Sequence, residues 1–302
     1  MNDRKQNVIK MAHQLFIDKG FQATSIQEIL DYSGISKGTF YNYFSSKSEL
    51  LMAIFKTNHT KLEKDRNSLL IGQSPSDIEI FIKQLEMQMK ANQRNKLFTL
   101  FEEVMVSNDN ELKAFLKQGQ LRVLSWIYQR LIDIFGESKK PYLLDSAIMF
   151  TGILQQNIKY HFMAKDTSYN INHVIRYSVE RLIGMVNELE KSGNQLFNPE
   201  QLEGWLPNCI KDNRGFQQKL YRSILDIKKG ISNDQTNQIR ILDFVEEELF
   251  DSKKPRKFLI ESVLFSLKSE PTFINKKALQ RLEQLIEDYF AYLDTETSSM
   301  EA

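Results

Sequence analysis

The side chains best suited to a chemical task lie in a short segment between residues 36 and 44. Phe40 and Phe44 are four residues apart, the spacing of one helical face, so both rings are expected to point inward. The exposed faces of such a helix carry hydrogen-bond donors and no negative charge: Lys37, Gly38, Thr39, Tyr41, Asn42 and Tyr43. Lysine contacts guanine or phosphate, asparagine pairs with adenine, and a threonine methyl meets thymine. The segment therefore predicts a helix that reads the major groove of duplex DNA.

The sequence contains no motif typical of a catalytic site. The sequence contains no glycine-rich phosphate loop, dinucleotide fingerprint, zinc cluster or nucleophile elbow. Its four histidines lack the spacing of metal ligands: His13, His59, His161 and His173. We therefore expect no catalytic residue, no metal site, no cofactor and no enzymatic activity.

Cysteine use and hydropathy indicate the compartment. Cys209 is the single cysteine, and no basic segment followed by an apolar one opens the chain, so a reducing cytoplasm is expected. The longest apolar runs, such as residues 147–150, fall far short of the roughly 18 residues of a membrane span. We expect a cytoplasmic protein with no membrane partner.

Composition favours an all-α fold. The chain of 302 residues contains only 12 glycines and 6 prolines, about half the usual share. Its net charge is +1, which argues against a surface devoted to polyanions. Residues 1–62 nevertheless hold eight Lys and Arg against five Asp and Glu, a mild basic bias that suits DNA contact through a small module.

Helix signals place the donor-rich segment in a helix-turn-helix. An apolar face with three- and four-residue spacing runs from Val8 to Phe16, and Gly20 ends that helix. Ser25 and Glu28 form a capping box for a second helix, which Gly34 interrupts. Ser36 caps the third helix, and Gly38 would let its N-terminus approach the DNA backbone closely.

The fourth helix adds a possible phosphate contact. Ser46 caps it, with Glu49 three residues later. Lys47 lies in its first turn, where a cation opposes the helix dipole, so a nearby phosphate would explain its position. The alternative is an ordinary solvated lysine.

These residues carry a resemblance to a known family. The run from Ala12 to Ile26, the segment Ser36–Phe44 and the sequence Lys47–Leu51 together resemble the DNA-binding domain of the tetracycline-repressor (TetR) family of bacterial regulators. The similarity spans residues 3 to about 60, and its ordered set of some twenty positions is specific. Relatives commonly end the third helix with Tyr-His or His-Phe, whereas this chain has Asn42, Tyr43 and Phe44.

The resemblance implies roles for individual positions. Base or phosphate contacts are implied for Ser36, Lys37, Gly38, Thr39 and Tyr41, with Asn42 and Tyr43 flanking them. Phosphate contacts are implied for Ser25 and Lys47. Because the end of the third helix departs from the family pattern, the operator sequence cannot be taken from a relative.

The middle of the chain is predicted to form a helical body. Helices are expected over residues 76–106 with a break near 91–95, and over 110–135, 142–164 and 170–191. Five aromatic residues there could line an apolar cavity for a small apolar or amphipathic effector: Phe98, Phe101, Trp126, Phe150 and Phe162. The alternative is that these rings are plain core.

The last helix of the body carries a narrow apolar seam. Its members follow spacings of 4, 3, 4 and 3: Ile175, Val179, Leu182, Val186 and Leu189. Such a seam suits either the core of one chain or a helix–helix interface. In similar regulators the last two helices of the ligand domain form a four-helix dimer bundle, and two DNA-reading helices must lie about 34–36 Å apart to reach successive major grooves. A homodimer is therefore expected.

This chain extends about a hundred residues beyond the length that is common in the family. Helical patterns recur over 214–229, 234–251, 255–268 and 275–293, and residues 295–302 resemble a frayed tail. This region suits a small helical subdomain or an enlarged dimer interface. We expect three parts: a DNA-binding domain (1–62), a ligand-binding and dimerisation domain (63–196) and an additional helical region (197–302).

The expected function is that of a transcriptional regulator. The leading hypothesis is a homodimeric repressor that binds a palindromic DNA operator and leaves it when an effector binds. One alternative is a ligand-independent factor that recruits a protein partner through the C-terminal region. Another is an all-helical enzyme or scaffold that uses the front domain only for interaction.

Overall fold

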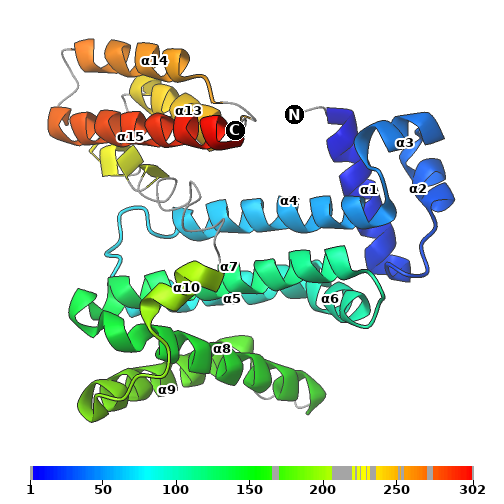
Figure 1. Ribbon diagram of the computed structural model, residues 1–302, viewed down its shortest axis with the longest axis horizontal. Coiled ribbons are helices and arrows are strands. Elements are labelled where there is room, and N and C mark those ends of the chain that lie inside the picture. Colours follow the sequence, from blue (N-terminus) through cyan, green and yellow to red (C-terminus); the bar gives the residue numbers. More distant parts are fainter. Residues whose placement is uncertain are drawn as a thin grey trace. The chain divides into compact units, whose positions relative to one another are not determined.

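The computed structural model divides into two compact units, Met1–Trp205 and Leu206–Ala302, each considered by itself (Figure 1). The structure describes residues 3–164, 170–205, 220–221, 223–224, 226–228, 230–231, 236–250, 252, 255–270 and 275–300. Over these residues all regular secondary structure is helical, so the predicted all-α class is confirmed. None of the described helices is both long enough and apolar enough to cross a membrane.

The N-terminal unit begins with four helices: α1 (Asp3–Lys19), α2 (Ile26–Ser33), α3 (Lys37–Tyr43) and α4 (Lys47–Ser68). Residues 3–62 are called the head below. The predicted capping box of α2 is present, and Gly34 ends that helix with a φ of 65°, in the left-handed region that glycine tolerates.

The rest of the N-terminal unit, residues 63–205, is called the body. Its elements are α5 (Ile78–Arg94), α6 (Leu97–Met105), α7 (Asn110–Phe135), the short 3₁₀ helix η1 (Glu137–Lys139), α8 (Lys140–Met163), α9 (Ile171–Ser192) and α10 (Pro199–Trp205). The predicted break near residues 91–95 separates α5 from α6, and Lys96 there has a φ of 46°.

A layered helical core fills the body. Helix α5 packs against α4, α6 and α9, while α8 packs against α7, α9 and α10. The ring of Phe81 lies between those of Trp126 and Phe150, with centroid distances of 5.9 and 6.0 Å. Two aromatic residues proposed for a pocket are therefore neighbours of the same buried ring.

The apolar seam of α9 faces this core. Ile175, Val179, Leu182 and Val186 are buried within the chain, whereas Leu189 is half-buried. Of the two uses that the sequence left open, core packing within one chain accounts for the seam. The spacing of apolar residues along a helix identifies its apolar face, but it does not identify the helix that covers this face.

The head and the body share one hydrophobic core. Buried residues of α1 to α4 pack with four side chains of α6 and α7: Leu100, Val104, Leu112 and Leu116. Removing these four side chains would leave apolar faces of α1 and α4 exposed to water. The position of the head is therefore tied to α6 and to the start of α7.

The C-terminal unit has its own core. Its helices include α13 (Thr236–Phe250), α14 (Lys257–Ser269) and α15 (Lys276–Met300), which enclose buried aliphatic and aromatic side chains. The helices predicted over 234–251, 255–268 and 275–293 are confirmed. Helix α15 continues to Met300, so the tail predicted from residue 295 is helical for most of its length. Most of the helix predicted over 214–229, and Cys209, lie outside the described residues.

Candidate nucleic-acid interface

Helix α3 is held at its N-terminus by a side-chain cap. The Ser36 Oγ accepts a hydrogen bond of 3.1 Å from the Thr39 backbone N–H and lies 2.9 Å from the Thr39 hydroxyl. A seven-residue helix gains little stability from its own hydrogen bonds, so tertiary contacts must hold it.

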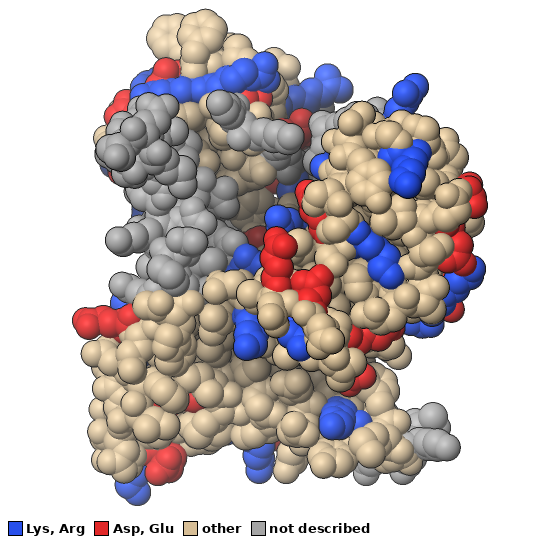
Figure 2. Space-filling model, turned by 45° about the vertical axis from the view of Figure 1, so that its right-hand side comes forward, with Lys and Arg blue, Asp and Glu red and all other residues tan. Residues whose placement is uncertain are grey.

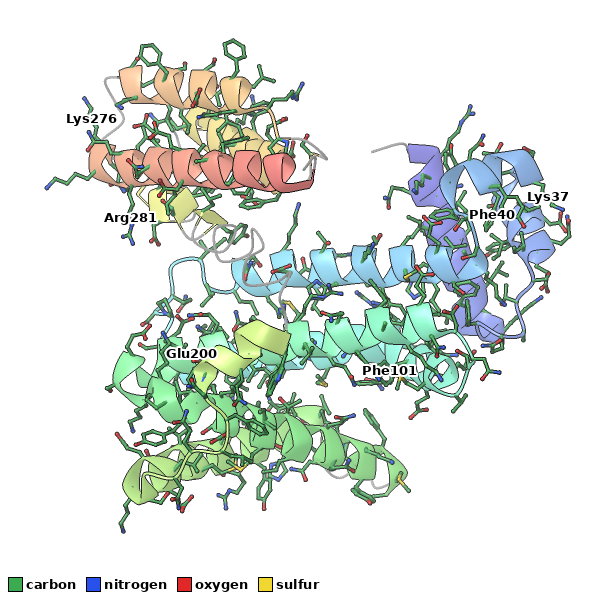
Figure 3. All side chains as sticks on the ribbon, viewed as in Figure 1. Lys37, Phe40, Phe101, Glu200, Lys276 and Arg281 are labelled. Atoms are coloured by element: carbon green, nitrogen blue, oxygen red, sulfur yellow. The ribbon has the colours of Figure 1, made fainter. Side chains whose placement is uncertain are left out.

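Two phenylalanines supply those tertiary contacts. Phe40 and Phe44 are 0% and 1% exposed and lie in the shared core, as the sequence predicted. Tyr41 packs the edge of its ring on Phe40, with centroids 5.4 Å apart, yet remains 46% exposed. In Figure 3, Lys37 lies at the outer side of the head.

The outer surface of α3 has the predicted character. Lys37, Gly38 and Asn42 are exposed, Thr39 is half-buried, and the helix contains no acidic residue. A Cβ added at Gly38 would meet only the Ser36 hydroxyl, at 3.9 Å, so the first turn is open to close approach. Tyr43 is half-buried against the core and presents less of its ring than the sequence suggested.

A lysine from α1 fixes the other end of α3. The Lys5 Nζ donates a 3.1 Å hydrogen bond to the Tyr43 carbonyl and lies 4.7 Å from the centre of the Phe44 ring. A cation at a helix C-terminus interacts favourably with the helix dipole. Sequence reasoning missed this contact because the two residues are 38 positions apart.

The carboxylates that flank α3 are engaged in local bonds. The Glu28 carboxylate accepts a 2.6 Å hydrogen bond from the Lys19 ammonium group and another from the Ser25 backbone N–H. These bonds lower the pKa of Glu28 to about 2. Glu49 accepts from the backbone N–H and hydroxyl of Ser45, which lowers its pKa. Ser25 itself is exposed at the start of α2, where a phosphate contact stays a prediction.

Lys47 makes contacts within the head that the sequence did not reveal. Its Nζ donates to the carbonyl oxygens of Phe21 and Thr24, both at 2.7 Å, and lies 4.5 Å from the centre of the Phe21 ring. Burial lowers its pKa, an effect that Glu103 and Glu28 oppose. These bonds explain a lysine in the first turn of α4 without a phosphate. Its predicted phosphate contact would compete with them.

A carboxylate of the body holds the same connection from the other side. The Glu103 Oε2, on α6, accepts from the backbone N–H groups of Phe21 and Gln22 at 2.8 and 3.1 Å. Gly20 precedes them with a φ of 89°, and a Cβ there would lie 3.0 Å from the Glu103 carboxylate. The connection between α1 and α2 is thus held between α4 and α6.

Two further hydrogen bonds join α1 to the region between α5 and α6. The His13 Nε2 lies 3.3 Å from the Asn95 carbonyl oxygen and must donate, because a carbonyl only accepts. The Lys96 Nζ donates to the Ile17 carbonyl at 2.9 Å. Residues of α6 and the segment before it therefore bond directly to α1 and to the α1–α2 connection.

The five aromatic residues predicted to line a pocket are not gathered in one place. Trp126 and Phe150 are buried beside Phe81. Phe98 and Phe162 are 44% and 50% exposed, and Phe101 packs at the edge of the shared core. Separately, a groove of about 450 Å³ between α4 and α5 is lined by apolar residues such as Leu62 and Met87 together with charged residues such as Lys61 and Lys83.

Charged groups are scattered on the face of the head that Figure 2 shows. Basic and acidic side chains lie there, at the right of the view, among uncharged surface. Such a surface can bind DNA only if hydrogen bonds and shape supplement charge. Among the described residues no cluster of three or more His, Cys, Asp or Glu side chains could hold a metal.

Comparison with known proteins agrees with this geometry. The family model described as bacterial regulatory proteins, tetR family, matches residues 8–54, which include α2, α3 and most of α1. Over 301 residues the chain is 29% identical to the uncharacterized HTH-type transcriptional regulator YerO of Bacillus subtilis, with 95% of this chain and 96% of the relative covered. The chain belongs to the TetR family.

Other relatives, named as HTH-type regulators, support the same assignment. The uncharacterized HTH-type transcriptional regulator YuxN of Bacillus subtilis is 24% identical over 274 residues, which cover 88% of this chain and 92% of the relative. The HTH-type transcriptional repressor KstR2 of Mycobacterium tuberculosis is 33% identical over 51 residues, 17% of this chain and 26% of the relative. No solved structure matches the chain. The protein is a TetR-family DNA-binding transcriptional regulator.

Substitution of Lys37 or Tyr41 by alanine should weaken DNA binding without unfolding the head. Lys37 is exposed, so its loss should change the free energy of unfolding by less than about 0.5 kcal/mol. Tyr41 also packs on Phe40, so its loss should cost about 0.5–1.5 kcal/mol, too little to unfold the head. Each lost contact should cost about 1–3 kcal/mol of operator affinity in a gel-retardation assay. Lys117→Ala removes the same charge from an exposed position on α7 and should bind as wild type. Unchanged retardation by both head variants would contradict the assignment.

Substitution of Glu103 by alanine should loosen the head from the body. The change leaves the Phe21 and Gln22 N–H groups without their charged acceptor, so the free energy of unfolding in urea should fall by about 1.5–3 kcal/mol. Glu102→Ala, at the exposed neighbouring position, is the matched control and should be near neutral. Equal effects of the two variants would argue against the role given to Glu103.

Proposed function

We propose that this TetR-family protein is a homodimeric repressor that binds a palindromic operator and is released by a small effector. The main support for the proposal is the structure of helix α3. Its outer surface carries no acidic residue, and the buried rings of Phe40 and Phe44 anchor its inner side in the core. Ser36, Lys37, Gly38, Thr39 and Tyr41 would contact bases or phosphates. Asn42 would flank them, and Ser25 would meet a phosphate.

Exposed faces of α8 and α9 support the dimer. The outward line of α8 is largely apolar and small: Met149, Gly152, Gln156, Tyr160 and Met163. Met149, Tyr160 and Met163 are 39%, 62% and 63% exposed, and Tyr177 on α9 is 50% exposed. A Cβ added at Gly152 or Gly184 would meet nothing within 4 Å, so a second helix could approach closely at either glycine.

These faces differ from the seam that the sequence singled out. The seam of α9 is occupied inside the chain, so the opposite side of the helix is the one available to a partner. Exposed apolar side chains on one face are typical of protein interfaces. Two α8 and two α9 helices would then form the four-helix bundle implied by the family resemblance.

Buried polar side chains near Trp126 support an amphipathic effector. The guanidinium of Arg66 lies 4.0 Å from the centre of the Trp126 ring and donates to the Gln88 Oε1 at 2.5 Å. Arg66 is 3% exposed, and burial lowers its pKa to about 10. A ligand with an apolar body and a hydrogen-bond acceptor would suit this combination of an aromatic ring and a buried cation.

Release would act through the contacts between α6 and the head. A ligand can shift the protein away from DNA only if it binds the released conformation more tightly than the bound one. Because Glu103 and Lys96 bond to the connection and the helix beside α3, a displacement of α6 would change the separation of the two α3 helices. Groove spacing in DNA is fixed, so a small change would lower affinity.

Selection of DNA fragments by the purified protein tests whether it binds DNA in a sequence-specific way. Retained fragments should share two inverted half-sites with centres about 10 base pairs, or a multiple of that, apart. Sequencing of the retained pool measures this directly. A pool without an enriched sequence would contradict specific reading and favour a role in protein interaction.

A bulky residue at Gly152 should separate the dimer. Gly152→Arg has room within its own chain but places a charged side chain in the proposed bundle, so light scattering should show the mass falling from twice 35.4 kDa to 35.4 kDa. Operator retardation should fall with it. Gly119→Arg is the control and should remain dimeric; Gly119 is a half-buried glycine of α7 where an added Cβ also meets nothing within 4 Å. A dimeric Gly152→Arg variant would exclude this interface.

A panel of amphipathic small molecules tests release. A true effector at 100 times its dissociation constant should stabilise the protein by about 2.7 kcal/mol, seen as a raised Tm, and should also reduce operator retardation. Arg66→Met should weaken both responses to the same compound. If no compound raises the Tm, release by an effector is contradicted and the ligand-independent alternative is favoured.

A further inference from the structure

The groove of about 450 Å³ between α4 and α5 lies entirely within the N-terminal unit. Its volume is within the roughly 300–1,000 Å³ of sites that hold drug-sized molecules. Residues of both helices line it, but neither Arg66 nor Trp126 is among them. The groove is therefore separate from the buried cation and ring to which the effector was assigned above.

The two helices that form the groove run in opposite directions. Helix α4 begins in the head, whereas α5 ends beside the head, where the Asn95 carbonyl oxygen lies 3.3 Å from the His13 Nε2. Further along α4, Arg66 bonds to Gln84 and Gln88 of α5. Positions before Arg66 on α4 are therefore level with positions after Gln88 on α5.

The end of the groove nearest the break between α5 and α6 is polar and basic. Asn58 and Lys61 of α4 and Arg94 and Asn95 of α5 line it. Lys61 and Arg94 are exposed, and over the residues that the structure describes neither side chain takes part in a hydrogen bond or an ion pair. Two free cations on facing helices can both donate to one carboxylate, phosphate or sulfonate group.

The floor of the groove is apolar. Leu62 is buried, while Leu69, Met87 and Ala91 are half-buried. A hydrocarbon chain or ring placed on these four side chains would remove the rest of their surface from water, which is favourable. The lining thus joins an apolar floor to a cationic end.

The acidic residues of the lining do not oppose an anion at that end. Glu86 lies 3.8 Å from Lys90 and accepts a hydrogen bond from the side chain of Asn172, so its charge is already engaged. Asp65 lies one helical turn from Lys61, away from the polar end. The lining as a whole contains four basic and two acidic residues, so its net charge favours a negative ligand.

We propose that this groove binds a small organic anion with an apolar body. The acidic group lies between Lys61 and Arg94, and the body covers Leu62, Met87 and Ala91. An inorganic anion would leave the apolar floor in water, and an uncharged ligand would leave both cations without a partner. The inference goes beyond the proposed function, because binding in this groove does not require release from DNA.

Fluorescence titration of the full-length protein tests the need for charge. The probe is anilinonaphthalene sulfonate, whose emission rises when its rings leave water, and its uncharged analogue is N-phenylnaphthylamine, which lacks the sulfonate. Lys61→Gln with Arg94→Gln should raise the dissociation constant of the anion about tenfold and change that of the analogue by less than about twofold. Lys117→Gln with Lys191→Gln removes two charges from exposed positions outside the groove and should leave both constants unchanged.

Acetylation of the unsubstituted chain locates the bound anion. A lysine ammonium group paired with a sulfonate loses its proton less readily, so Lys61 should react several-fold more slowly with acetic anhydride when the probe is saturating. Mass spectrometry of the peptides measures this rate, and Lys117 should react equally fast with and without the probe. Because no variant is needed, this measurement is decisive even if the double variant is unstable.

Either measurement can overturn the inference. Equal weakening of the anion and of its uncharged analogue in the double variant would show a loss of shape rather than of charge. Equal acetylation of Lys61 with and without the probe would show that the groove is empty or filled by another part of the chain.

The outcome is separable from that of the proposed function. A protein that retards operator DNA but does not protect Lys61 loses only the groove site. A protein that protects Lys61 but retards no operator loses only the proposed repressor.

Discussion

Four apolar side chains of the body complete the hydrophobic core of the head. Leu100, Val104, Leu112 and Leu116 pack with the buried faces of α1 and α4, and Phe40 and Phe44 of α3 lie in the same cluster. Burial of this kind is the dominant stabilising term in a domain of this size. Helix α3 is therefore positioned by α6 and the start of α7, since one continuous core joins them.

Local features of the head could be predicted from sequence because each depends on neighbours a few residues apart. The capping box of Ser25 and Glu28, the left-handed Gly34 and the inward Phe40 all follow from short-range rules. The contacts of Lys5, Glu103 and His13 were missed because their partners are 38 to 82 residues away. Hydropathy patterns carry no information about such hydrogen bonds.

The same limit applies to Lys47 and to the aromatic residues of the body. The position of Lys47 suggested a phosphate, because sequence does not reveal that three backbone carbonyls of the α1–α2 connection lie within 3.4 Å of its ammonium group. The aromatic residues of the body were grouped by type, but Phe98 and Phe162 occur at helix ends, where a ring can point to solvent. Trp126 and Phe150 are mid-helix residues and are buried.

The use of lysines inside the head affects which charges can meet DNA. Lys5, Lys19 and Lys47 are bonded to a carbonyl, a carboxylate and a loop within the head. The other basic side chains of the head are exposed: Arg4, Lys10, Lys37, Lys56 and Lys61. If the head meets DNA, the displacement of counterions, and with it the salt dependence of binding, would depend mainly on this exposed set.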